Sequence, residues 1–303
     1  MFCCFPESLD IFAPMSKNCY MKIKTYLFTV LPTVLFLIVL SAAMFSAKDV
    51  YRVRDGRTIP FHTMLQDLKM TDFVFVGEIH DDPDTHLSEL AIINALHAAN
   101  VPLTIGLEMF RADSQRALNS WVNGTLPLDN FLPIYYDNWR QAWPLYRDIF
   151  TYAREHRIPM IGLNIPDAIA ATVAQSGFAS LAEKEKKNLP PGISCDVDPT
   201  YMAFIRRAYA NHPTKMDKRF LNFCEAQMVW DKSMAWHLLE YRKKHPEHTI
   251  VVLAGVGHAW KRGIPEQIAR ESKYTFKVVM PLVPDQIEKD TVSMKDADYV
   301  ILQ

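Results

Sequence analysis

Two short stretches of the chain place histidine and glutamate at the end of an apolar run. Glu78 and His80 follow the run Phe73–Val76, and His258 follows the run Ile250–Leu253. In an extended segment, residues i and i+2 point to the same side, so Glu78 and His80 can serve one site. Imidazole and carboxylate groups together can hold a divalent metal ion that activates water, or they can act as general acid and base. Both stretches therefore predict buried strands that end in chemically active residues.

Each of these histidines comes three residues after a glycine, Gly77 in the first stretch and Gly255 in the second. Glycine adopts backbone conformations that are closed to bulkier residues, and it allows another group to approach the backbone closely. We therefore expect a ligand to lie against both turns.

Further polar residues follow two other apolar runs. Glu108 comes directly after Leu103–Leu107, with Arg111 three residues on, and Asn164 comes after Met160–Leu163. In an open parallel sheet, ligands bind at the carboxyl ends of the strands. The sequence therefore predicts one site at this edge of the sheet. Its candidate metal ligands or catalytic residues are Glu78, His80, Glu108 and His258, and Arg111 and Asn164 are candidate ligand-binding residues.

A predicted helix around 225–244 carries a mixed face. Gln227, Asp231, Met234 and Leu238 are spaced four, three and four residues apart, so they lie on one side of the helix. Buried polar groups need hydrogen-bond partners. Gln227 and Asp231 are therefore either a buried hydrogen-bonded pair that packs the helix onto the sheet, or ligand-binding residues in the wall of the strand-end site.

The remaining polar residues have simpler interpretations. Tyr201 and Tyr209 are candidate haem ligands, because tyrosine can bind haem iron. Aspartates after His80 are expected to cap a helix: Asp81, Asp82 and Asp84. Seven further histidines of the body are interpreted as surface or helix residues: His86, His97, His156, His212, His237, His245 and His248.

Alternating strand and helix patterns predict an α/β layered fold with a mainly parallel sheet flanked by helices, and with a smaller helical subdomain. Expected strands are 73–76, 103–107, 160–163, 250–253, 276–280 and 299–302, after a lead-in and short helix over 49–68. A helix beginning at Asp82-Pro83 is expected to bury the stripe Leu87, Leu90, Ala91, Ala95 and Ala98. Helical patterns also cover 111–156, 265–272 and about 167–244; the last, a predicted insertion, is interrupted only at 188–192 and 211–213.

Bulk composition narrows the class of protein. The chain has 303 residues, half of them hydrophobic, and a formal net charge of −1. Positive and negative charges are therefore nearly equal in number, and the chain has no excess of positive charge that would attract nucleic acid.

The N-terminus differs from the body. Lys22 and Lys24 precede an uncharged apolar run from Thr25 to Ala47. This pattern is typical of a secretory signal peptide, and a run of roughly 20 residues is also long enough to span a bilayer as an uncleaved anchor. We expect residues 1–47 to be one of the two, and the domain at 48–302 to be exported, either to the periplasm or to the outer side of a membrane. An exported protein permits a disulfide between Cys195 and Cys224, but the sequence leaves this open.

Taken together, these residues resemble those of the ChaN-like haem-binding uptake family, within the TIKI and erythromycin-esterase superfamily. The resemblance rests on the two Gly-x-x-His turns, on Glu108 after Ile105-Gly106-Leu107, and on Glu225-Ala226-Gln227 with Asp231. It covers roughly residues 61–302.

The resemblance implies two activities. Superfamily members include metal-dependent hydrolases that use the paired histidines and nearby acidic residues. The ChaN-like branch is linked to haem binding and iron uptake, through a tyrosine at a dimer interface, and its members are surface lipoproteins. In this chain no cysteine directly follows the apolar run, where a lipid would be attached. The leading hypothesis is an exported haem-binding protein of haem or iron uptake that forms a homodimer. The alternatives are a metal-dependent hydrolase that holds a divalent ion, and a binding module whose polar cluster is a relic.

Overall fold

The computed structural model describes residues 49–210, 219–284 and 286–302. The predicted signal peptide or anchor at 1–47 lies outside the described residues. Among the described helices, none is long and apolar enough to cross a membrane. The predicted domain boundaries stay a prediction.

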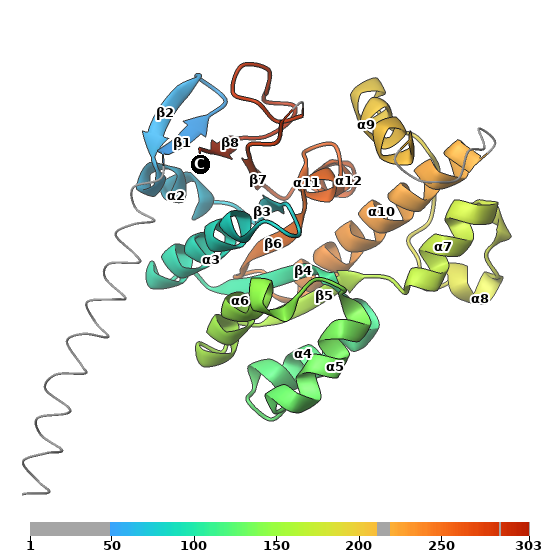
Figure 1. The fold of residues 1–303 in the computed structure, drawn as a ribbon, viewed down its shortest axis with the longest axis horizontal. Coiled ribbons are helices and arrows are strands. Elements are labelled where there is room, and N and C mark those ends of the chain that lie inside the picture. Colours follow the sequence, from blue (N-terminus) through green and yellow to red (C-terminus); the bar gives the residue numbers. More distant parts are fainter. Residues whose placement is uncertain (1–48, 211–218, 285, 303) are drawn as a thin grey trace, which may run out of the picture. The chain divides into compact units, whose positions relative to one another are not determined.

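The strands form an eight-stranded sheet in the order β2-β1-β8-β7-β3-β6-β4-β5. All pairs from β8 to β5 are parallel, whereas β1 runs antiparallel to both of its neighbours. The predicted α/β fold with a mainly parallel sheet is therefore confirmed (Figure 1). The strands are β1 (Asp49–Arg52), β2 (Arg57–Pro60), β3 (Phe73–Glu78), β4 (Leu103–Arg111), β5 (Met160–Asn164), β6 (Thr249–Gly255), β7 (Phe276–Pro281) and β8 (Tyr299–Ile301).

Helices cover both faces of this sheet. Phe73 and Phe75 of β3 belong to the core cluster that also contains residues of the long helix α10. Val74 and Val76 point to the opposite face and are buried as well. Burial on both faces explains why the strands have continuous apolar sequences.

The helices are α2 (Phe61–Leu68), α3 (Pro83–Ala98), α4 (Gln115–Val122), α5 (Leu128–Asn138), α6 (Trp143–Glu155), α7 (Asp167–Ser176), α8 (Glu183–Lys186), α9 (Pro199–Ala210), α10 (Phe220–Lys244), α11 (Val256–Ala259) and α12 (Ile264–Glu271). Short 3₁₀ turns occur at η1 (Ala112–Ser114) and η2 (Phe178–Ser180). In Figure 1, α3 and α6 lie together and α10 extends beside α7 and α12, in agreement with their contacts.

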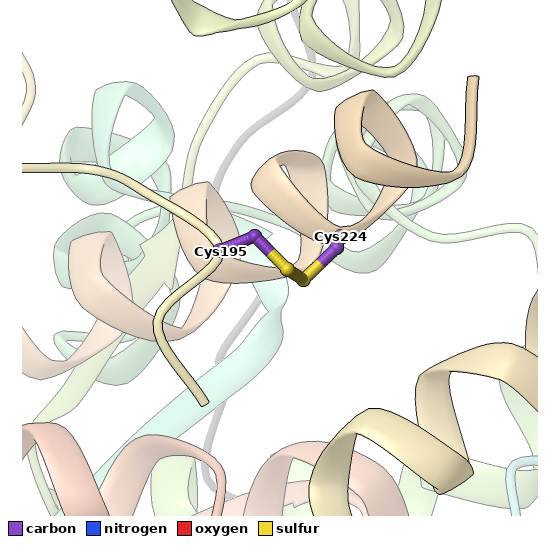
Figure 2. Close-up of a disulfide and its surroundings, with 2 residues drawn as sticks. All are labelled: Cys195 and Cys224. Atoms are coloured by element: carbon purple, nitrogen blue, oxygen red, sulfur yellow. A yellow bond between two sulfur atoms is a disulfide. The ribbon is translucent and has the colours of Figure 1, made fainter. Parts of the chain in front are cut away.

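The region 167–244 is less continuous than its pattern predicts. Gly177 ends α7 with a positive φ of 85°, which favours glycine, and the chain is irregular from 187 to 198. Cys195 in this irregular segment forms a disulfide with Cys224 of α10, with 5.5 Å between the two Cα atoms (Figure 2). The disulfide therefore ties the segment that leads into α9 to the helix that supports the sheet.

The edge strand β5 is bordered by a side chain rather than by another strand. Gln115, at the start of α4, donates from Nε2 to the carbonyl oxygen of Met160 at 2.8 Å and accepts the backbone N–H of Gly162 at Oε1 at 3.0 Å. Its amide therefore pairs with the β5 backbone as a neighbouring strand would.

Candidate functional site

Three adjacent strands bring the predicted residues to one edge of the sheet. In the parallel pairing of β3 with β6, Glu78 lies opposite Gly255, and β4 is the next strand beyond β6. Here β4 continues past Leu107 to Arg111, so Glu108 lies within the strand. The Gly255 N–H donates to Glu108 Oε2 at 2.6 Å. The carboxyl ends of β3, β6 and β4 therefore share one polar centre.

One side of this centre is built around His80. Its Nδ1 lies 2.6 Å from Glu78 Oε1, and the same oxygen accepts the hydroxyl of Tyr146 at 2.5 Å. The ring of Trp139 packs edge-on against the imidazole, 4.9 Å between centroids. The Glu78 carboxylate can only accept, so His80 Nδ1 carries a proton and Nε2 is left for chemistry. The His80 side chain is 37% exposed, so a ligand can reach it.

The other side is built in the same way around His258. Its Nδ1 lies 2.7 Å from Asp231 Oδ1, and Tyr201 donates its hydroxyl to Asp231 Oδ2 at 2.6 Å. His258 Nε2 lies 3.8 Å from Glu108 Oε1. Two tyrosine–carboxylate–histidine units thus flank Glu108. We call the group Glu78, His80, Glu108, Asp231 and His258 the strand-end cluster.

The glycines make room for side chains of the protein. A Cβ atom on Gly255 would lie 2.7 Å from His80 Cε1 and 3.0 Å from its Nε2. A Cβ atom on Gly77 would lie 2.6 Å from the sulfur of Met280. The space that we expected a ligand to use is therefore filled, at Gly255 by the imidazole of the cluster itself.

The carboxylates of the cluster favour charged imidazoles. Burial on its own would lower the pKa of His258, but Glu108 and Asp231 outweigh it and raise the pKa to about 9. The pKa of His80 is also raised: burial opposes the charge, and Glu78 and Glu108 favour it. Burial would raise the pKa of Glu78, but His80 and His86 keep it lowered. With no cation bound, His258 is therefore protonated at neutral pH and can donate from Nε2, and the surroundings of His80 favour its charged form more than water does.

Three predicted residues take other places. Arg111 donates from Nη2 to Asp137 Oδ2 at 2.6 Å, which directs its guanidinium to α5. Asn164 donates from Nδ2 to the backbone carbonyl of Glu108 at 2.9 Å, so it holds the β4 backbone next to the cluster. Gln227 lines a groove on α10, as described below.

Asp231 and Tyr201 contribute to the cluster, and both are almost fully buried. Asp231 is at once a buried hydrogen-bonded residue and part of the strand-end cluster. The Tyr201 hydroxyl is engaged with Asp231.

Helix α3 presents a buried polar face. Asp82 caps the helix as expected, by accepting the Asp84 N–H at 2.9 Å. His86, interpreted from the sequence as a surface or helix residue, lies in α3, but it is buried at 4% exposure and its Nδ1 lies 3.0 Å from Glu89 Oε2. The predicted apolar stripe is wrong, since Leu87 is exposed. The buried positions are Thr85, His86, Ser88, Glu89, Ile92, Ile93 and Leu96.

Sequence reasoning missed His86, Glu89 and Tyr146. One signal was available for the first two: His86 and Glu89 continue the helical spacing of Ile93 and Leu96, at intervals of three, four and three. Burial and the neighbouring Glu78 raise the pKa of Glu89 well above its usual range.

A groove lies beside the strand-end cluster, between α7, α9 and α10. Its volume is about 420 Å³, and its lining includes Tyr209, Arg219, Phe223, Gln227 and Trp230. The Trp230 ring also packs edge-on against His258, with 6.0 Å between centroids. The predicted haem ligand Tyr209 and the predicted ligand-binding residue Gln227 therefore line one groove, separated from the cluster by one aromatic ring.

Comparisons with known proteins concern the fold and the family of the chain. A structure described as cofacial haem binding to ChaN of Campylobacter jejuni has a TM-score of 0.64 and 23% sequence identity, and the match covers 84% of this chain and 96% of that one. This likeness shows the fold. A mutant of the erythromycin esterase EreC has a TM-score of 0.45 at 13% identity, over 80% of this chain and 78% of that one. A Bacillus cereus protein has a TM-score of 0.42 at 13% identity, over 80% and 74%.

Scores as low as the last two support no inference. No curated protein matches the chain. The family model for haem-binding uptake proteins of the ChaN type, in the Tiki superfamily, matches residues 64–268. The chain therefore belongs to the ChaN family of haem-binding uptake proteins.

Proposed function

We propose that this chain is an exported haem-binding protein that acts in haem or iron uptake, and that haem binds in the groove lined by Tyr209. The observation that carries the proposal is a groove that combines a phenol with aromatic walls, in a chain of this family. Its volume of about 420 Å³ falls in the range of ligand pockets.

The donors in the groove suit haem. Tyrosine oxygen is one of the axial ligands that proteins offer to haem iron. Phe223 and Trp230 can pack on the porphyrin faces or edges, and the guanidinium of Arg219 can pair with a propionate carboxylate. The groove is open on one side, so a second copy of the chain can cover the other face of the haem. We include a homodimer in the proposal for this reason.

A hemin titration tests the proposal. The full chain, purified in mild detergent, is titrated with hemin while the Soret absorption is recorded. We expect a saturable shift that Tyr209→Phe weakens at least tenfold in affinity, about 1.4 kcal/mol. The matched control is Tyr136→Phe, an exposed tyrosine of α5 outside the groove, which should bind as the wild type does. Equal binding by Tyr209→Phe would refute this placement, and the absence of any Soret shift would refute haem binding.

Export and the dimer need separate measurements. The Cys195–Cys224 disulfide supports export, because disulfides persist in oxidising compartments. Cell fractionation with mass analysis of the mature N-terminus distinguishes cleavage near residue 47 from an uncleaved anchor, and recovery from the cytoplasm would contradict export. Light scattering with and without hemin tests the dimer: an unchanged monomer mass would contradict it.

The strand-end cluster favours a second candidate, a metal-dependent hydrolase. Carboxylates hold Nδ1 of both histidines, which is the usual support for an imidazole that binds a metal through Nε2. His80, His258 and Glu108 would then hold the ion, and the ion would supply an activated water. Metal bound in elemental analysis and lost in both His80→Ala and His258→Ala, together with no hemin binding, would favour this candidate over haem.

A further inference from the structure

A second polar group lies buried behind the strand-end cluster. Glu78 of β3 and His86 and Glu89 of α3 are between 0 and 4% exposed, and one donor atom of each lies within 4.8 Å of the other two. Glu78 belongs to both groups. Its Oε1 holds His80 and Tyr146, and its Oε2 points to His86 Nδ1, 3.6 Å away. We call Glu78, His86 and Glu89 the buried triad.

The hydrogen bond made by His86 Nε2 determines which ring nitrogen of His86 carries a proton, and therefore whether a proton or a lone pair faces the two carboxylates. His86 Nε2 lies 3.2 Å from the backbone carbonyl oxygen of His80. A carbonyl only accepts, so Nε2 carries the proton, and a neutral imidazole then has its lone pair at Nδ1. That lone pair faces Glu89 Oε2 at 3.0 Å and Glu78 Oε2 at 3.6 Å. With a neutral imidazole three electron-rich atoms converge, so an electropositive group is required among them, either a metal ion or a second proton on His86 Nδ1.

Two oxygens of the triad lack partners. As carboxylates, Glu78 Oε2 and Glu89 Oε1 are buried and have no hydrogen-bond partner among the residues that the structure describes. Glu78 cannot compensate through its other oxygen, which already accepts from two donors. Buried charges are normally paired or bound to metal. The missing partner is therefore expected between Glu78 and Glu89.

We propose that the buried triad binds one divalent transition-metal ion of the Zn²⁺ type, through Glu78 Oε2, His86 Nδ1 and the Glu89 carboxylate. Donors 3.0 and 3.6 Å apart fit around one ion at bond lengths of about 2.0–2.2 Å. One imidazole with two carboxylates suits Zn²⁺, Mn²⁺ or Fe²⁺. Mg²⁺ does not suit this site, since it prefers oxygen ligands and keeps several waters, whereas the triad is buried and includes an imidazole nitrogen.

The surroundings of the triad match those of a metal site. A ligating histidine usually donates its other ring N–H to a carbonyl or carboxylate, as His86 does to the His80 carbonyl. Ligating carboxylates are themselves hydrogen-bonded, as Glu78 is by Tyr146. Because Glu78 also holds His80, the ion fixes one wall of the strand-end cluster. This site is separate from the one that His80 and His258 would form in the hydrolase candidate, and it does not rest on haem binding.

Metal binding by the full chain in mild detergent tests the proposal. The chain is stripped with EDTA and loaded with Zn²⁺ alone, and bound zinc and the melting temperature are measured. We expect about one tightly held zinc ion and a higher melting temperature. Glu89→Gln should lose both responses. His258→Asn, which leaves the triad intact, should keep both, so the two sites are distinguished. Mg²⁺ should raise the melting temperature of none of the three.

A proton shared by the two glutamates is the competing explanation. Gln in place of Glu89 would imitate the protonated acid, so Glu89→Gln would match the wild type in stability, and neither would respond to zinc. That result would overturn the proposal, as would zinc binding lost in His258→Asn but retained in Glu89→Gln. If Glu89→Gln fails to fold, Co²⁺ loading of the wild type decides: visible absorption bands of Co²⁺ bound to nitrogen and oxygen donors are expected in both the wild type and His258→Asn, and their absence from His258→Asn refutes the triad.

Discussion

Replacing Gly255 by alanine tests whether this glycine exists to accommodate His80. The new Cβ would lie 2.7 Å from His80 Cε1 and 3.0 Å from Nε2, so the ring must move. The ring cannot move freely, because Glu78 holds Nδ1 and Trp139 packs against it. Overpacking of this kind costs about 1–3 kcal/mol. Loss of the charged hydrogen bond to Glu78 adds about 1.5–3 kcal/mol if the ring swings away completely.

We expect Gly255→Ala to lower the free energy of unfolding by about 2–3 kcal/mol, in the lower half of the combined range of about 1–6 kcal/mol, because the exposed side of His80 allows part of the movement. For a domain of this size, that is a fall in melting temperature of about 4–12 °C. The pKa of His80, followed by NMR, should also fall from its raised value toward that of a free imidazole.

The double variant with His80→Ala separates this mechanism from a general backbone effect. With the imidazole removed, the methyl group introduced by Gly255→Ala has space, so the two changes should be less than additive by about 1 kcal/mol or more. Gly77→Ala is the matched control: it collides with Met280, so its effect should add to that of His80→Ala. Strict additivity of Gly255→Ala with His80→Ala would refute the reasoning.

Two further predictions concern charge and covalent structure. The pKa of His258 is raised to about 9 in the folded chain, against about 6.5 in the unfolded chain, so the folded state holds this proton more tightly. The resulting stabilisation, on the order of 3 kcal/mol, is fully present below about pH 6.5 and is lost as the pH rises to about 9; melting temperatures across this window should show the loss, and Asp231→Asn should flatten it. The Cys195–Cys224 disulfide closes a loop with a sequence separation of 29, so its reduction should cost about 3–4 kcal/mol. Denaturant unfolding with and without reductant measures this, and a Cys195→Ser/Cys224→Ser variant whose stability still responds to reductant would contradict it.

The sequence was sufficient for the six strands from β3 to β8 and for the composition of the polar edge, whereas β1 and β2 lie in the segment 49–68 that was expected to be a lead-in and a short helix. Apolar runs that end in Gly77 and Gly255 mark central strands, because a strand buried on both faces has no polar alternation. Parallel order then brings Glu78, Glu108 and the turn before His258 to the same edge. Each of these inferences depends on a local sequence pattern and on the rule that parallel strands end at the same edge of a sheet.

Contacts between distant segments were beyond such reasoning. That His80 fills the space at Gly255 depends on the pairing of β3 with β6, which are far apart in the sequence. Burial of Glu89 on α3 contradicts the rule that charged residues face solvent, and it becomes understandable only beside Glu78. Arg111 was expected at the site because it follows Glu108 closely, but an irregularity in β4 between 107 and 111 redirects it.

The amide of Gln115 has a consequence for the behaviour of the molecule in concentrated solution. An open edge strand offers unpaired N–H and C=O groups on which another chain can add a strand. On β5, one side chain occupies a donor and an acceptor of that edge, at Met160 and Gly162, with a single residue between them. An incoming chain that adds to this edge would find backbone groups of the first three residues of the five-residue strand already hydrogen-bonded. One glutamine thereby hinders the addition of a foreign strand at the β5 edge of the sheet.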